Sequence, residues 1–88
     1  MQLTYPAIFY EGEGGYAVEI PDLPGCVSGG VTLAEAILMG TDAASGWVLT
    51  ELEDGKLAPK ASPIEAIHPK TGGFVSILVL DMDAYAEK

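Results

Sequence analysis

The side chains with the clearest capacity for chemistry are carboxylates near the ends of expected strands and on one expected helix. Two-metal nucleases hold a pair of divalent ions with such carboxylates, and the ions stabilise the attacking and leaving oxygens. A metal centre of this kind could be imagined from Glu19, Asp22, Asp42, Asp81 and Asp83. However, Glu19 is expected on the solvent side of a strand, and Asp81 and Asp83 simply follow the last strand. We therefore expect no catalytic residue, no metal and no cofactor.

One histidine and one cysteine are the other reactive side chains. His68 has no second titratable group at a fixed spacing, so it is expected to be a surface residue and not a general base. Cys26 has no base or cation beside it in the sequence, so a packed thiol is expected. A single cysteine also excludes an intrachain disulfide and fits a reducing cytoplasm.

The first part of the chain is expected to form an antiparallel meander. A strand over Leu3–Tyr10 contains Pro6, which cannot donate to a ladder, so the strand starts late or has that position on an edge. A glycine-rich hairpin loop over Glu11–Gly15 leads into a strand over Tyr16–Ile20, whose alternation indicates one buried side. Cys26–Ser28 is expected to be a short third strand.

A capped amphipathic helix is expected to follow the meander. Thr32 and Glu35 form a capping box at its start, and Asp54-Gly55 supplies its end. Gly40 lies on the apolar side of this helix, so it is expected to permit a close approach to a strand. The stripe expected to cover the sheet comprises Leu33, Ala36, Ile37, Gly40, Ala44, Trp47 and Val48.

The segment from Lys56 to Gly73 contains three of the prolines and is expected to be an extended connector. It has one short turn, Pro63–Ile67, which Ser62 and Glu65 are expected to cap. The expected fold is α+β in the order β-β-β-α-β, with three or four mainly antiparallel strands and one long helix on one face.

The last expected strand, Val75–Leu80, is apolar on both faces, and one helix cannot cover both. Either the strand is central and the connector covers its second face, or another subunit does so. We favour a homodimer or higher homo-oligomer. The residues expected at that interface are Ser76, Ile77, Leu78 and Leu80.

Thirteen carboxylates face four lysines and no arginine, which gives a formal net charge of −9. Phosphate backbones are bound through Lys and Arg, so direct nucleic-acid binding by this chain alone is disfavoured. An acidic surface suits a basic protein partner, although the charge could also serve only to keep a small apolar domain in solution. The sequence has no apolar run long enough for a membrane span and no signal-peptide pattern, so a cytoplasmic protein is expected.

The outer face of the expected helix has the pattern of a small binding site. Leu38 and Leu49 point in nearly the same direction, opposite the buried stripe. Glu35, Asp42 and Glu53 surround them. Two apolar anchors within an acidic rim suit a basic protein partner, whereas two isolated exposed leucines would be ordinary.

Two motifs carry a family resemblance. Gly15–Gly25 reads G-Y-x-V-x-I-P-D-L-P-G, and Gly30–Ala36 reads G-x-T-L-x-E-A. Together with the opening segment Tyr5–Tyr10, they resemble the N-terminal domain of the HicB family of antitoxins, a small domain of the UPF0150 type, over nearly the whole chain. The resemblance implies a partial ribonuclease-H-like fold that lacks the catalytic carboxylates of such nucleases.

The resemblance also implies a function. A HicB-like antitoxin would bind and neutralise a small basic HicA-like toxin that cleaves mRNA, by steric and electrostatic occlusion, and would have no chemistry of its own. Many HicB proteins continue into a DNA-binding domain where this chain has only residues 83–88. We therefore expect one HicB-like domain over residues 1–88, without a C-terminal DNA-binding domain and without operator binding by this chain alone. Whether it is a stand-alone protein or part of a longer one stays open.

Other readings remain. The main alternative is an orphan HicB-like protein-binding module without a toxin partner. RNA binding by the domain itself would show an affinity that falls steeply with salt. A metal-dependent nuclease is the most distant alternative.

Overall fold

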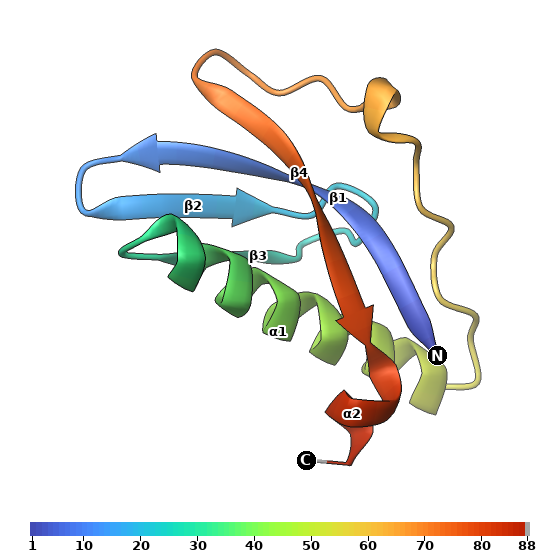
Figure 1. Cartoon of the computed structure of the whole chain (residues 1–88). Coiled ribbons are helices and arrows are strands. Elements are labelled where there is room, and N and C mark those ends of the chain that lie inside the picture. Colours follow the sequence, from blue (N-terminus) through green and yellow to red (C-terminus); the bar gives the residue numbers. More distant parts are fainter. Residues whose placement is uncertain (88) are drawn as a thin grey trace.

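A four-stranded antiparallel sheet, in the order β3-β2-β1-β4, forms one layer, and α1 packs across one of its faces (Figure 1). The computed structural model describes residues 1–87. Its elements are β1 (Gln2–Gly12), β2 (Gly15–Glu19), β3 (Val27–Gly30), α1 (Leu33–Glu53), the 3₁₀ turn η1 (Ile64–Ala66), β4 (Gly73–Asp81) and α2 (Met82–Ala86). The expected α+β class and the β-β-β-α-β order are confirmed, and α2 is an addition that the sequence reasoning missed. No helix within residues 1–87 is long and apolar enough to cross a membrane.

β1 is the strand that joins the two halves of the sheet. It pairs with β2 between Ile8 and Gly12, and with β4 over a longer stretch that places Pro6 opposite Ile77. The expectation of a late start is wrong, because β1 already begins at Gln2. Pro6 nevertheless lies beyond the end of the β2 pairing, so its missing N–H interrupts no ladder on that side.

The core lies between the sheet and α1. The sheet contributes Tyr5, Ala7, Phe9, Val18, Leu78 and Leu80, and α1 contributes Ala36, Ala44 and Val48, all of which are buried. A Cβ atom added to Gly40 would lie 3.2 Å from Cγ1 of Val18, so the expected close approach is confirmed.

The buried line of α1 follows residues spaced four apart, from Ala36 through Gly40 and Ala44 to Val48. Such a line drifts around the helix by about 40° with each step, because four residues make slightly more than one turn. Ile37 lies off this line near the start of α1 and is 37% exposed. Its assignment to the buried stripe is therefore wrong.

Both ends of α1 are capped as the sequence predicts, with one difference. The Thr32 hydroxyl accepts a hydrogen bond from the Glu35 N–H at 3.0 Å, while the Glu35 carboxylate accepts from the Val31 N–H at 2.9 Å, one residue before the usual position. At the other end Gly55 adopts a positive φ of 78°. The Lys56 N–H donates to the Glu51 carbonyl, which completes a Schellman-type end.

The loop between β2 and β3 is fixed to the core and to α1. Leu23 is fully buried, and the indole N–H of Trp47 donates to the Pro24 carbonyl at 3.0 Å. Cys26 is 5% exposed and carries a free thiol, which confirms the expectation of a packed cysteine. The loop residues of the P-D-L-P-G motif therefore have structural contacts of their own.

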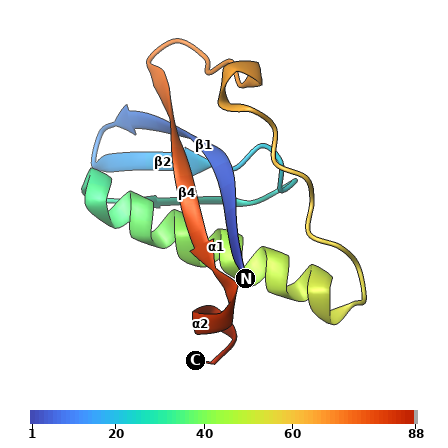
Figure 2. The same ribbon diagram turned by 45° about the vertical axis from the view of Figure 1, so that its right-hand side comes forward.

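The connector between α1 and β4 runs alongside β1, as Figure 2 shows. The Tyr5 hydroxyl donates to the Pro59 carbonyl at 2.6 Å, and the Lys70 N–H donates to the Tyr10 hydroxyl at 3.0 Å. The expected short turn is confirmed as η1, but no side chain caps it. Ser62 instead donates twice to Asp22, so its expected role as a cap is wrong.

Candidate partner-binding site

The exposed anchor of the candidate site is Leu38, on the side of α1 that faces away from the sheet. Its side chain is 70% exposed. It borders a cavity of about 250 Å³ between α1 and the C-terminal end of the chain. The lining of this α1–α2 cavity includes Leu38, Asp42 and Ser45 from α1, and Asp81, Ala84 and Tyr85 from the other wall. An apolar side chain therefore stands beside two carboxylates in a concave surface.

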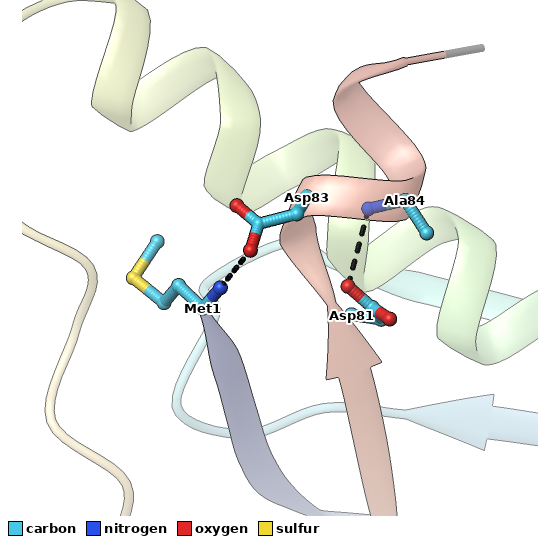
Figure 3. Close-up of polar contacts among 4 residues, drawn as sticks. All are labelled: Met1, Asp81, Asp83 and Ala84. Carbon is cyan, nitrogen blue, oxygen red and sulfur yellow. Dashed lines mark hydrogen bonds and ion pairs between the residues drawn. The ribbon is translucent and has the colours of Figure 1, made fainter.

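The second wall of the α1–α2 cavity is fixed in place partly by contacts with Met1, just before β1. The Asp81 carboxylate accepts a hydrogen bond from the Ala84 N–H at 3.1 Å and so caps α2. The amino terminus of Met1 pairs with the Asp83 carboxylate, and Figure 3 shows both contacts. The Met82 N–H also donates to the Met1 carbonyl at 3.0 Å, and the Met82 side chain is buried. These contacts place α2 against the sheet end and shape the cavity.

Gly46 is a position at which the Tyr85 side chain of α2 packs against α1. A Cβ atom added there would lie 2.9 Å from the Tyr85 hydroxyl oxygen. Nothing in the local sequence around Gly46 indicates this contact with a later helix. The signal that could have revealed α2 was Asp81 itself, an N-cap residue type placed three residues before Ala84.

The structure brings together only some of the five predicted partner-binding residues. Leu38 and Asp42 share the α1–α2 cavity. Leu49 is half-buried and packs against the hydrophobic core, so it is not a second exposed anchor. Glu53 is exposed in the last turn of α1. Glu35 is exposed as well, but one of its oxygens accepts the Val31 N–H.

Glu35 borders a different and wider hollow, of about 500 Å³, at the β1–β2 hairpin. Glu11, Glu13 and the 70% exposed Val31 also line this hairpin hollow. The surface along α1 thus has two hollows, each with one prominent exposed apolar side chain and at least two carboxylates. No lysine or arginine occurs between Leu33 and Glu53, so α1 carries only negative charge.

The carboxylates that could be imagined as a metal centre do not form one. Within residues 1–87, no three His, Cys, Asp or Glu side chains come together as a metal site would require. Asp22 accepts two hydrogen bonds from Ser62, and Asp81 caps α2. His68 is exposed in the connector, as expected.

The residues predicted for an oligomer interface lie on both faces of β4. Leu78 and Leu80 are buried against α1, 1% and 0% exposed, so their side chains serve the core of a single chain. Ser76 is half-buried on that same face. Ile77 is 42% exposed on the opposite face, next to Val79 at 54%. An oligomer through this strand stays a prediction, and Ile77 and Val79 are the side chains that could carry it.

Burial acts on two titratable groups. Burial raises the pKa of the Cys26 thiol, which disfavours the thiolate. Burial, together with the negative charge of Asp22, raises the pKa of the Tyr5 phenol. Both shifts favour the neutral form, and neither prepares a nucleophile or a base for catalysis.

Three comparisons place the chain among known proteins. A family model described as the HicB-like antitoxin of a bacterial toxin–antitoxin system matches residues 5–88. An uncharacterised 14.9 kDa protein from the rep–hol intergenic region of Haemophilus phage HP1 is 39% identical over 83 residues. That match covers 92% of this chain and 62% of the phage protein, so the chain spans less than two thirds of this relative.

Solved structures agree with the family match. The N-terminal domain of the Burkholderia pseudomallei antitoxin HicB is 28% identical, with a TM-score of 0.75 over 90% of this chain and 99% of that one. A chain of a toxin–antitoxin complex from Streptococcus pneumoniae has a TM-score of 0.85 over 97% of this chain and 73% of that one. At 24% identity, the second likeness is one of fold.

Proposed function

This chain belongs to the family of HicB-like antitoxins of bacterial toxin–antitoxin systems, and from that premise we propose that it binds and neutralises a small basic toxin of the HicA type. The observation that carries the proposal is the family match over residues 5–88. The likeness to an antitoxin N-terminal domain supports it, because that domain is matched over 99% of its length.

The electrostatics of the chain support a basic partner. The formal net charge is −9, and α1 contributes the carboxylates Glu35, Asp42, Glu51 and Glu53 without any cation. A surface of one sign attracts a partner of the opposite sign and raises the rate of encounter. A toxin that binds RNA must carry positive charge to contact the phosphate backbone. The acidic surface of this chain would therefore compete with RNA for the basic surface of the toxin.

The α1–α2 cavity supplies the apolar part of the proposed contact. Interfaces draw most of their binding energy from a few well-packed anchors surrounded by polar residues. Leu38 is an exposed anchor of this kind, and Asp42 and Asp81 stand beside it. A toxin lysine or arginine fits the surroundings, because its aliphatic stem would contact Leu38 while its charged end approached the carboxylates.

Inhibition would then be stoichiometric and would need no chemistry on the antitoxin. The bound domain would cover the RNA-binding surface of the toxin and exclude its substrate. Such a mechanism requires neither a metal nor a catalytic residue in this chain. It predicts one inhibited toxin for each domain bound.

The experiment that tests the proposal is co-expression of the tagged chain with a small basic toxin of the HicA type. We expect a complex that survives purification and associates faster at low salt, because the opposite charges attract. If the two purified and folded proteins do not bind each other, the proposal is contradicted. That result would favour a HicB-like binding module with another partner.

A further inference from the structure

β4 presents a long open edge of the described sheet. Its neighbour on one side is β1, and no strand within residues 1–87 lies on its other side. Natural edge strands are protected by shortness, lysine, proline, a bulge or a covering element. β4 has nine residues, and from Phe74 to Leu80 it contains no charge and no proline. The opposite edge, β3, has only four residues and lies under the start of α1.

The register of β1 determines which backbone groups of β4 face this open edge. The two-residue loop Glu13-Gly14 makes Gly12 and Gly15 the closing pair of the β1–β2 hairpin, which is a hydrogen-bonded pair. Counting back by twos, the backbone groups of Ile8 and Pro6 point toward the β2 side. Pro6 therefore forms a non-hydrogen-bonded pair with Ile77. The N–H and C=O of Ile77 consequently point away from β1, to the open edge.

Between Phe74 and Leu80 the exposed side chains of β4 are apolar on both faces. Ile77 and Val79 are 42% and 54% exposed on the face away from α1, and Phe74 is 41% exposed on the face toward it. Val75 is half-buried beside Ile77 on the outer face. Free backbone groups and apolar side chains thus occur along the same seven residues. This combination is the usual template for pairing with another strand.

We propose that this edge pairs with β4 of a second copy of the chain, antiparallel, about a two-fold axis at Ile77. In this register Ile77 lies opposite Ile77 of the second copy, and Val75 lies opposite Val79. All three positions have their backbone hydrogen-bonding groups on the open edge, so each pair exchanges two hydrogen bonds. The outer face of the seam then consists of β-branched pairs, which pack well across strands. The result is one continuous sheet through both copies.

Charge favours a second copy over a basic partner at this edge. No carboxylate lies between Phe74 and Leu80, so the seam offers a basic strand no complementary charge. In the proposed register Asp81 lies opposite Gly73 of the second copy, whose preceding turn carries Lys70. The two copies of Asp81 are about 26 Å apart along the strands, at about 3.3 Å per residue. That separation exceeds the screening length of about 8 Å at physiological salt, so the acidic ends do not oppose pairing.

The first test is the mass in solution of the full chain and of two matched variants. Ile77→Lys places two lysines opposite each other at the proposed axis. Val27→Lys makes the same change at a residue that is 64% exposed on β3, at the other edge of the sheet. We expect the wild type and Val27→Lys to be dimers by light scattering, and Ile77→Lys to be a monomer with an unchanged circular dichroism spectrum.

The second test examines the register and does not depend on the fold surviving a buried charge. In Ile77→Cys the two new thiols face each other at a Cα separation of about 5.5 Å, within disulfide range. In Val79→Cys the two thiols stand about 13 Å apart, which is too far. We expect mild oxidation to link Ile77→Cys into a dimer. Val79→Cys and the wild type, whose Cys26 is buried, should stay unlinked.

Three results would overturn the proposal. One is a wild-type chain that is monomeric at high micromolar concentration, and another is a dimer that Ile77→Lys leaves intact. The third is equal or faster cross-linking of Val79→Cys, which would place another register or another surface at the contact. If the wild type is a monomer and Ile77→Lys loses a protein partner, the edge binds that partner and not a second copy.

Discussion

The Asp22 carboxylate accepts two hydrogen bonds from Ser62, one from the backbone N–H at 2.8 Å and one from the hydroxyl at 2.6 Å. This contact joins the loop between β2 and β3 to the connector, forty residues further along the chain. The aspartate of the P-D-L-P-G motif thus has a structural role in this chain. Hydrogen bonds to a charged group contribute about 1.5 to 3 kcal/mol each when buried, and less where water competes.

Removing Asp22 should lower the stability of the fold more than removing the Ser62 hydroxyl does. We expect Asp22→Ala to reduce the free energy of unfolding by about 2 kcal/mol and Ser62→Ala by about 1 kcal/mol, because the second change leaves the backbone N–H bond in place. The double variant should resemble Asp22→Ala, since the hydroxyl contact requires the carboxylate. Urea unfolding followed by the fluorescence of Trp47, the single tryptophan, measures all three.

Glu13→Ala is the matched control for this series, because it removes one carboxylate at an exposed loop position. It should change the free energy of unfolding by less than about 0.5 kcal/mol. Additive losses in the Asp22 and Ser62 double variant would show that the two residues do not act as one contact.

The two glycines within α1 should respond differently to a larger side chain. Gly40→Leu adds atoms where a Cβ already lies 3.2 Å from Val18, so we expect a loss of about 1 to 3 kcal/mol from overpacking. In Gly46→Ala the new methyl would lie 2.9 Å from the Tyr85 hydroxyl oxygen, so the Tyr85 side chain on α2 must shift. The gain in helix propensity, about 1 kcal/mol, should then offset part of that strain. Equal losses in the two variants would contradict this description of the core.

Cys26 should be a protected thiol whose raised pKa affects the stability of the fold only at alkaline pH. Burial raises its pKa above the ordinary value of 9.0, so the unfolded chain loses this proton at a lower pH than the folded one. The contribution to stability is therefore complete below about pH 9 and is lost as the pH rises through the folded pKa. Native protein at pH 7.5 should react slowly with a thiol reagent, and fast only in urea. Rapid labelling of native protein would contradict the burial of this side chain.

The toxin-binding surface can be located by replacing exposed apolar residues of equal exposure with alanine and comparing the loss of toxin binding. Leu38 and Val31 are both 70% exposed, one at the α1–α2 cavity and one at the hairpin hollow. If the toxin binds over the α1–α2 cavity, Leu38→Ala should weaken the complex about tenfold or more, as the loss of an interface anchor does. Val31→Ala should then have little effect, as should Leu57→Ala, at a leucine that is 90% exposed in the connector.

All three substitutions should leave the free energy of unfolding nearly unaltered, since the side chains are on the surface. Binding constants from calorimetry, measured at one salt concentration, decide between the two hollows. A loss with Val31→Ala and none with Leu38→Ala would move the site to the hairpin end of α1.

Local patterns predicted most of the fold. The capping box at Thr32 and Glu35, the positive φ at Gly55 and the close approach at Gly40 each depend on a few neighbouring residues, so the sequence alone indicates them. Contacts between distant segments were not predicted. Ser62 had the type and spacing of a helix cap, but its hydrogen bonds go to Asp22.

The candidate site was predicted in part for the same reason. Helical geometry indicates that Leu38 and Leu49 point in one direction, but only the tertiary fold shows that Leu49 packs against the core. The short helix α2 contains five residues and lacks a periodic pattern, although it forms one wall of the cavity. Burial and cavities arise from the packing of segments that are far apart in sequence.

The most direct test of the proposed function is a titration of toxin-dependent RNA cleavage with the purified chain. A HicA-type toxin that the chain binds is held at a fixed concentration well above the dissociation constant, and the uncleaved fraction of a labelled mRNA is measured. The account predicts a linear loss of cleavage that is complete near one equivalent of the domain, with no cleavage by the chain alone in Mg²⁺. Cleavage that persists in excess chain, while the toxin remains active and the chain folded, would contradict it.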